Sequence, residues 1–323
     1  MRLHNLHDLP KVCDSLTYLY VEHCRVEQEE KSIAIYDQYG MTPVPCASLM
    51  LLMLGPGVAI THAAILTLAD NDCLIAWCGE YGVRFYAAGS GATRSATRLL
   101  RQAILATRMS TRLEVVRRLY EMRFAEPIDP DLTLQQIRGM EGMRVRRAYA
   151  QVSANTGVPW NGRSYERNSW GASDPVNRAL SSANSCLYGV CHAAIVAAGY
   201  SPALGFIHTG KQLSFVYDVA DLYKMELTVP VAFSVAASHD GQVERAARIL
   251  CRDAFAQADL LGRIVKDMER ALDIRLPDDD AAQFDEDPAL PGGLWDPEQG
   301  TVAGGQNYGE TSADSGPAEE LPF

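Results

Sequence analysis

The sequence predicts an α+β protein of two domains, a small N-terminal β-sandwich or β-roll and a larger all-α domain, followed by an acidic tail. Short β-branched and aromatic runs between turn residues fill residues 1–90. Apolar residues at helical spacing dominate residues 91–275. Residues 276–323 hold six Pro, seven Gly and twelve acids, with no Lys or Arg. Such a composition buries too little apolar surface to order a chain, so a disordered tail is expected there.

The β-rich region is expected to contain four strands and one short helix. Segment 23–27 alternates polar and apolar residues, as a half-buried strand does. Three further short runs lie between turn residues and are β-branched or aromatic, at 33–36, 73–78 and 83–87. Residues 63–68 predict a short helix. Ala-Gly-Ser-Gly at 88–91 marks the expected hinge to the helical region.

Helical signals dominate after the hinge. Seven apolar residues follow steps of three and four and predict one buried helical face: Leu99, Ala103, Ala106, Met109, Leu113, Val116 and Tyr120. Asp174 and Pro175 combine a capping side chain with a proline near the first helical position. A helix is therefore expected from 176 to 198, ending at Gly199, and its many small residues predict a central buried position. Residues 244–272 predict further helix.

The net charge of −11 hides two opposite regions. Without the acidic tail, residues 1–275 hold 29 bases and 28 acids, a net charge of +1. Within 84–167 there are 15 arginines, no lysine and 7 acids, a net charge of +8. The positive charge of residues 84–167 therefore predicts a partner rich in phosphate. The negative net charge of the whole chain, taken alone, would argue against such a partner.

The arginines are expected to form two helical stripes. The first contains Arg94, Arg98, Arg101, Arg108 and Arg112, and the second contains Arg245, Arg248 and Arg252. A solvated helix face is the simpler alternative, but an all-arginine stripe suits bidentate contact with phosphate. If about six to ten phosphates are contacted, affinity for DNA should fall about 10³–10⁵-fold between 50 and 200 mM salt.

A second feature is a set of residues suited to a divalent cation. His208, Asp218 and Asp221 lie within fourteen residues, and the two aspartates are three apart. Glu141, within an arginine-rich stretch, is the expected fourth member. Three carboxylates and an imidazole beside arginines suit Mg²⁺ or Mn²⁺ that must also hold a phosphate.

Each member of this set also has a structural alternative. Asp218 and Asp221 could be surface carboxylates paired with Lys211 or Lys224. His208 could be a satisfied loop histidine. Glu141 could be the ion-pair partner of Arg138 or Arg144, because charged side chains are mostly exposed and without a catalytic role.

Several classes of protein are disfavoured. The first ten residues lack the apolar core of a signal peptide, and the most apolar window, 49–65, is interrupted by Gly-Pro-Gly, so no membrane association is expected. The eight cysteines lack zinc-site spacing and resemble reduced core thiols, which predicts a cytoplasmic protein without structural zinc. Gly-Ser-Gly at 89–91 could hold a phosphate, but a plain hinge is favoured because no nucleotide-binding loop follows. Nucleophilic catalysis by Cys191 and His192 is disfavoured, since adjacent helical residues point apart.

In the acidic set and in the motifs around it, the chain resembles the CRISPR-associated spacer-acquisition integrase and endonuclease family, the "Cas-one" proteins, of the type I-E kind. The resemblance covers roughly residues 15–275 and rests on motifs at 54–57 with 62–64, 77–80 with 82–84, 123–124, 138–142, 160–163, 186–190, 205–211 and 214–221. It implies an N-terminal β domain over 1–90 for dimerisation and DNA-end contact, and a catalytic helical domain over 91–275.

The resemblance also implies site residues and partners. Glu141, His208 and Asp221 are implied as metal ligands, with Asp218 beside them. The combined candidates for DNA contact are Arg84, Arg94, Arg98, Arg101, Arg108, Arg112, Arg138, Arg163, Lys211, Tyr217, Lys224, Arg245, Arg248 and Arg252. A fork wedge would fall on His23 or Tyr20. The implied assembly is two homodimers flanking a dimer of a small "Cas-two" partner, bound to a double-stranded DNA fragment and to CRISPR repeat DNA.

The implied reaction is a transesterification in which the 3′-hydroxyl of a DNA fragment attacks a phosphodiester at the edge of a CRISPR repeat. Two alternatives remain open at this point. A stand-alone structure-specific DNase would use water as the nucleophile. A non-catalytic DNA-binding scaffold would use the acidic set only for structure.

Overall fold

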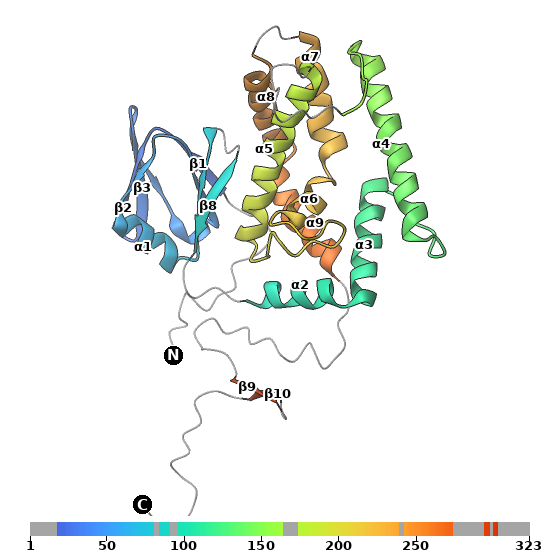
Figure 1. Ribbon diagram of the computed structural model, residues 1–323. Helices are drawn as coiled ribbons and strands as arrows, with labels where there is room; N and C mark the ends of the chain where they lie inside the picture. The colour runs from blue at the N-terminus through green and yellow to red at the C-terminus, as the bar shows by residue number, and fades with distance from the viewer. Residues whose placement is uncertain are drawn as a thin grey trace, which may run out of the picture. The chain divides into compact units, whose positions relative to one another are not determined.

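The computed structural model describes residues 18–80, 84–90, 96–163, 174–238, 242–273, 294–297 and 300–302 of the 323-residue chain. The chain divides into two units, Met1–Arg275 and Leu276–Phe323. A strand-rich N-terminal region is followed by a mostly helical one, as predicted (Figure 1). The proposed domain limits of 1–90 and 91–275 lie within the first unit and stay a prediction.

The strand-rich region contains two four-stranded sheets in the part of the chain described. In the first sheet, β1, β5 and β7 are parallel neighbours and β8 joins β7 antiparallel. In the second, β4, β3 and β2 form an antiparallel meander, and β6 adds in parallel to β2. The strands are β1 (Tyr18–Val21), β2 (Arg25–Glu29), β3 (Ser32–Asp37), β4 (Gly40–Val44), β5 (Leu51–Leu54), β6 (Ala59–Ile60), β7 (Leu74–Cys78) and β8 (Phe85–Gly89).

Both sheets and helix α1 (His62–Asp70) share one apolar core. Val26 and Ile33 of the second sheet, Leu52 of the first and Leu68 of α1 are all fully buried. The strands predicted at 33–36 and 73–78 and the helix predicted at 63–68 are confirmed. The prediction at 83–87 is confirmed from Phe85 onward; residues 81–83 lie outside the described part.

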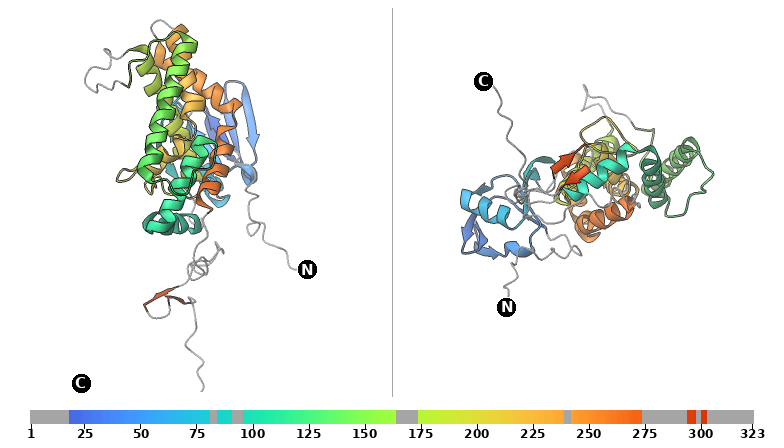
Figure 2. Two further views of the ribbon diagram at one scale, coloured as in Figure 1. Left: turned by 90° about the vertical axis from the view of Figure 1, so that its right-hand side faces the viewer. Right: turned by 90° about the horizontal axis from the view of Figure 1, so that it is seen from below.

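The helical region surrounds one central helix, α5, as the two views of Figure 2 and Figure 1 show. Asp174 caps α5 by accepting a hydrogen bond from the Asn177 backbone N–H, and Pro175 is its first residue, so the predicted start is confirmed. The helices are α2 (Thr97–Thr107), α3 (Met109–Phe124), α4 (Leu134–Thr156), α5 (Pro175–Ala197), α6 (Ser214–Ala220), α7 (Val229–Ser238), α8 (Val243–Gln257) and α9 (Leu260–Leu272).

The small side chains of α5 let other helices approach it closely. Helices α6, α7, α8 and α9 all pack against it, and Ala179, Ala183 and Cys191 are fully buried. Of the described helices, α5 alone has the length and apolar composition of a membrane span, but 56% of that window is buried inside the protein. That burial is typical of the core helix of a globular domain.

The helix expected to carry one apolar face from Leu99 to Tyr120 is broken. Helix α2 ends at Thr107, Arg108 is extended (φ −87°, ψ 125°) and α3 begins at Met109. The break changes the helical phase, so Leu99 is 39% exposed and Met109 is 72% exposed, against the prediction. A second break, at Asp259 (φ 43°), divides the predicted helix at 244–272 into α8 and α9.

The tail contains one element of regular structure among its described residues. Strands β9 (Leu294–Asp296) and β10 (Gly300–Val302) pair antiparallel. A tail without any regular structure was expected here, so the prediction is wrong for this hairpin, and the remainder of the tail lies outside the described part.

The thiols of the described residues fit the expected reduced core. Seven cysteines are free and buried, and Cys13 lies outside the described part. Burial, with a smaller contribution from Glu22, raises the pKa of Cys78 to about 12. A thiol held so far from ionisation is a poor nucleophile, so Cys78 has a packing role.

Candidate functional site

Glu141 is placed by the long helix α4. Thr133 and Gln136 form a capping box at its start, and Gly157 ends it with φ 70°, a conformation that favours glycine. Ile137 is the one residue of α4 that is buried, so most of the helix is solvated. The Glu141 side chain is an exception to that solvation, being only 17% exposed, because it faces a pocket.

Asp221 is placed by the short helix α6, which ends immediately before it. Asp221 is the C-cap residue, and after Leu222 and Tyr223 the chain forms a π-helical turn, Lys224–Thr228, that leads into α7. Pro230, which has no N–H to donate, follows that turn. Turns of this kind are frequent at functional sites, and this one carries Lys224 beside Asp221.

Glu141 and Asp221 line the same pocket, with a volume of about 550 Å³. Its walls come from α3, α4, α5, the π-helical turn and residues 160–163. The described lining residues include five cationic and two acidic side chains, an excess of three positive charges. The charged residues are Arg123, Arg144, Arg146, Arg163, Lys224, Glu141 and Asp221.

The two carboxylates share a buried guanidinium. Nη1 of Arg123 lies 3.9 Å from Oε1 of Glu141, and Nη2 lies 3.3 Å from Oδ2 of Asp221. The Arg123 side chain is only 3% exposed. Two further cations contact the same carboxylates: Nε of Arg144 lies 2.8 Å from Glu141, and Nζ of Lys224 lies 2.6 Å from Asp221. Both ion pairs suggested as structural alternatives, Arg144 with Glu141 and Lys224 with Asp221, therefore exist.

Lys224 stays charged despite its burial. Burial disfavours the ammonium, but Asp221 and Tyr188 more than offset that effect, so the pKa of Lys224 is raised. Its Nζ also lies 4.9 Å from the centre of the Tyr188 ring. The pocket therefore keeps this positive charge at every physiological pH.

Asp218 has a different environment from Asp221, although the two are three residues apart. It is fully buried and accepts hydrogen bonds from the backbone N–H groups of Phe206, Ile207 and His208. Its Oδ1 also lies 2.7 Å from Nδ1 of His208. With its oxygens occupied, Asp218 positions His208 and its loop, and a catalytic role for Asp218 stays a prediction.

His208 is held with one ring nitrogen occupied and its side chain 44% exposed. Since Nδ1 is bonded to Asp218, Nε2 is the nitrogen left for a ligand. A series of contacts runs from His208 towards Asp221: its ring packs edge-on against Tyr217, Tyr217 packs against Tyr188, and Tyr188 contacts Lys224, which pairs with Asp221.

The donor set fits a divalent cation only in part. Glu141 and Asp221 face one pocket, and Mg²⁺ is commonly held by one or two carboxylates together with substrate phosphates. Among the residues that the structure describes, however, no three His, Cys, Asp or Glu side chains are grouped closely enough to hold a metal ion. The pocket brings Glu141 and Asp221 together, and the metal site of Glu141, His208 and Asp221 with Asp218 beside them stays a prediction.

The first arginine stripe is largely used to hold backbone carbonyl groups of other segments of the protein. Arg98 donates to the Ala198 carbonyl and pairs with Glu269, Arg101 donates to the Leu272 carbonyl, and Arg112 donates twice to the Phe206 carbonyl. Because the break at Arg108 separates α2 from α3, the single straight stripe is wrong. Arg94 lies outside the described residues.

The remaining candidates for DNA contact fall into two groups. Arg163 and Lys224 line the pocket, and Tyr217 lies beside it, against Tyr188. The others are on the surface away from its lining: Arg84, Arg138, Lys211, Arg245, Arg248 and Arg252. Of the two wedge candidates, Tyr20 donates to Glu22 at 2.5 Å, and His23 packs against Gly57 with φ 51°.

Several residues of the pocket are not among the predicted site residues. Arg123 looks like any other arginine in an arginine-rich region, and only its burial distinguishes it. Tyr149 and Trp160 stack with their ring centres 4.5 Å apart and form an apolar wall of the pocket. The signal available for Arg123 and Trp160 was their presence in the motifs at 123–124 and 160–163.

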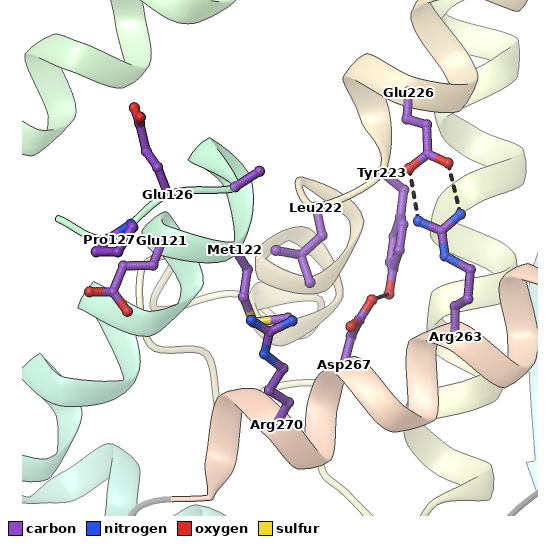
Figure 3. Close-up of a pocket in the computed structure, with 11 residues that line it drawn as sticks. Glu121, Met122, Glu126, Pro127, Leu222, Tyr223, Glu226, Arg263, Asp267 and Arg270 are labelled. Atoms are coloured by element: carbon purple, nitrogen blue, oxygen red, sulfur yellow. Dashed lines mark hydrogen bonds and ion pairs between the residues drawn. The ribbon is translucent and has the colours of Figure 1, made fainter.

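A second pocket, of about 500 Å³, is lined in part by residues of the same segment, 221–226 (Figure 3). There, Arg263 makes a bidentate pair with Glu226 at 2.7 and 2.8 Å, and the Tyr223 hydroxyl donates to Asp267 at 2.6 Å. Leu222, Tyr223 and Glu226 line this second pocket, whereas Asp221, Lys224 and Met225 line the first. Residues 221–226 are thus a common wall.

Comparisons with known proteins identify the family. The model for "CRISPR associated protein Cas1" matches residues 121–246, which include Glu141 and Asp221. "CRISPR-associated endonuclease Cas1 2" of Thermus thermophilus is 55% identical over 317 residues, covering 98% of this chain and 97% of the relative. "CRISPR-associated endonuclease Cas1" of Escherichia coli is 41% identical over 260 residues, covering 80% and 85%. A crystal structure of a TtCas1–DNA complex superposes with a TM-score of 0.76 at 55% identity, covering 82% of this chain and 99% of that one. The chain therefore belongs to the family of CRISPR-associated Cas1 endonucleases.

Proposed function

We propose that this protein is a metal-dependent DNA integrase and endonuclease of CRISPR adaptation. It joins the 3′-hydroxyl ends of a captured DNA fragment to repeat DNA by transesterification. The observation that carries the proposal is the meeting of Glu141 and Asp221 at one buried guanidinium, inside a pocket with an excess of positive charge. Two carboxylates suit a divalent cation, and the surrounding arginines suit a phosphodiester.

Mg²⁺ or Mn²⁺ would be held by Glu141 and Asp221, with Nε2 of His208 as a third ligand. When bound, the cation polarises the phosphate and stabilises charge on the attacking and leaving oxygens. His208 would approach this cation from beside Tyr217, whose ring packs edge-on against it.

The protein's own side chains then bind and orient the DNA. Arg144, Arg146 and Arg163 present guanidinium groups to the pocket, where they would bind phosphate oxygens. Lys224, which stays charged, lies at the same wall as Asp221. Lys211 and Tyr217 would lie near the end of the incoming DNA, as the resemblance implies. Asp218 holds the His208 ring in one orientation throughout.

The proposal extends to partners and place of action. The solved complex of a 55% identical relative with DNA supports DNA binding by this chain. We further propose a homodimer, assembly of two such dimers on a dimer of the Cas-two protein, a type I-E kind of system and a cytoplasmic location. Size-exclusion chromatography with light scattering, with and without the partner, tests the assembly.

A plasmid assay tests the reaction. A labelled DNA fragment with free 3′-hydroxyl ends is mixed with a supercoiled plasmid carrying the repeat, the Cas-two partner and either Mn²⁺, Mg²⁺ or EDTA. Joined product that requires the metal is expected. Nicking without joining would instead identify a stand-alone DNase that uses water.

The same assay tests the remaining alternative. If Glu141→Gln, His208→Ala and Asp221→Asn proteins gave the same DNA products as the wild type, the acidic set would be structural, and the protein would be a DNA-binding scaffold. Glu114→Gln on the exposed surface of α3 serves as a matched control, since it removes one carboxylate outside the pocket.

A further inference from the structure

Arg123 lies in the pocket wall at the point where three elements meet. It belongs to the last turn of α3, and it contacts Glu141 on α4 and Asp221 at the end of α6. Its Nη2 also donates to the backbone carbonyl of Asp218 at 3.2 Å. Its guanidinium carbon lies 5.2 Å from the centre of the Tyr120 ring. These contacts fix the position of a charge that arginine does not lose.

The Arg123 guanidinium is not fully satisfied by these contacts. The residue is 92% buried, and its Nε has no hydrogen-bond partner among the described residues. An unpaired buried donor is unfavourable, as is a buried charge that pairs with Glu141 only at 3.9 Å. A contribution to stability therefore does not explain why an arginine is buried, imperfectly paired, between two candidate metal ligands.

The positive charge of Arg123 affects how strongly the pocket can bind a cation. A divalent cation held by Glu141 and Asp221 would lie close to a fixed positive charge in a poorly solvated place, where repulsion is strong. The pocket already carries three positive charges in excess, and the cation alone would raise that excess to five. A DNA backbone that enters with the cation brings negative phosphate groups, and these lower the net positive charge of the pocket.

We propose that Arg123 is a built-in counter-ion that makes the binding of the divalent cation depend on DNA. In the DNA-free protein it holds the two carboxylates and keeps their affinity for the cation low. Once phosphates enter the pocket, the cation binds tightly. The inference rests on the proposed metal-dependent function and adds the order in which the site is assembled.

If DNA raises the affinity for the cation by a given factor, the cation must raise the affinity for DNA by the same factor. We expect coupling of at least about tenfold in the wild type, within the usual range of such couplings. An integrase that acquires its cation only with DNA would not cut or join before its substrate is in place.

Mn²⁺ serves as the probe. Its binding to the full-length protein is measured by electron paramagnetic resonance and calorimetry, with and without a DNA duplex whose 3′ ends are dideoxy-terminated so that no joining occurs. The variants are Arg123→Met, which removes the charge at similar length, and Arg123→Lys, which keeps it. Arg263→Met is the matched control, because it removes an arginine that pairs with Glu226 in the second pocket.

The expected result is that Arg123→Met binds Mn²⁺ about tenfold more tightly without DNA and shows weaker coupling. Arg123→Lys and Arg263→Met should keep the wild-type affinities. Unchanged or weaker Mn²⁺ binding by a folded Arg123→Met protein would overturn the inference. If that variant does not fold, equal Mn²⁺ affinity of the wild type with and without DNA would overturn it as well.

The inference and the proposed function fail in different ways. A wild type that joins DNA with Mn²⁺ but shows no coupling retains the function and loses the inference. A wild type that binds Mn²⁺ and DNA cooperatively but joins nothing retains the coupling and loses the integrase. A wild type that binds no Mn²⁺ under either condition loses both.

Discussion

His208 and Asp218 are joined side chain to side chain, with Nδ1 of the imidazole 2.7 Å from Oδ1 of the carboxylate. The carboxylate is fully buried, whereas the imidazole is 44% exposed. Asp218 also gathers the backbone N–H groups of residues 206–208. One buried anion therefore shapes the loop and sets which imidazole nitrogen faces outward.

Asp218→Asn should destabilise the protein by about 3 kcal/mol, because an amide that replaces the carboxylate cannot accept from all of the N–H groups around it. Urea unfolding followed by circular dichroism measures the change. His208→Ala, which removes only a half-exposed ring, should cost no more than about 1 kcal/mol. A similar cost for both variants would show that Asp218 does not organise the loop.

Gly205→Ala should also be destabilising, by about 1–3 kcal/mol. A Cβ at this position would lie 2.4 Å from the His208 carbonyl oxygen and 2.7 Å from Cβ of Ser214, neither of which can move without disturbing the loop. Gly139→Ala is the matched opposite, since nothing lies within 4 Å of its Cβ on α4. That helical glycine should gain about 0.5–1 kcal/mol. Thermal unfolding of both variants distinguishes the two outcomes.

Glu141→Gln should lower the rate of DNA joining at least about 100-fold, since it removes an anion from the proposed site of the cation. The Arg144 pair is lost with the charge, but the side chain keeps its shape, so the urea midpoint should change little. Single-turnover joining kinetics with saturating Mn²⁺ provide the measurement. A rate within a few-fold of the wild type would remove Glu141 from the catalytic set.

Stability should fall in mild acid through His192. Burial lowers its pKa from the usual 6.5, and its ring packs 3.9 Å from that of Phe85. The folded protein then binds fewer protons than the unfolded chain between the lowered pKa and 6.5. The full stability is therefore present above pH 6.5 and is lost as the pH falls through that window. His192→Phe should flatten the dependence of the free energy of unfolding on pH in this window. An unchanged slope would show that another group causes the loss of stability.

Local signals explain which parts of the fold were predictable. The strand at 33–36 and the start of α5 have patterns complete within a few residues: β-branched residues between turns, and Asp174 followed by Pro175. The parallel pairing of β1 with β5 depends on residues more than thirty positions apart, so no local pattern reveals it. The break at Arg108 has neither Gly nor Pro, and it is stabilised by Thr111, whose hydroxyl donates to the carbonyls of Leu105 and Arg108.

In the candidate site, too, some features have a local sequence signal and others depend on tertiary packing. Glu141 and Asp221 were found because an acid among arginines and a pair of spaced aspartates are visible in the chain. Their convergence on Arg123 was not predictable, since burial of one arginine among fifteen depends on tertiary packing. Asp218 resembles Asp221 in sequence, and only its complete burial separates a residue that shapes a loop from one that faces a pocket.

Residues 221–226 divide their side chains between the two pockets, with Leu222, Tyr223 and Glu226 lining one and Asp221, Lys224 and Met225 lining the other. A small molecule lodged between Tyr223 and Arg270 in the pocket of Figure 3 would press on the main chain that carries Asp221 and Lys224. It would do so from outside the pocket that Glu141 and Asp221 line. If the first pocket binds DNA as proposed, such a molecule is expected to inhibit the protein without competing with DNA.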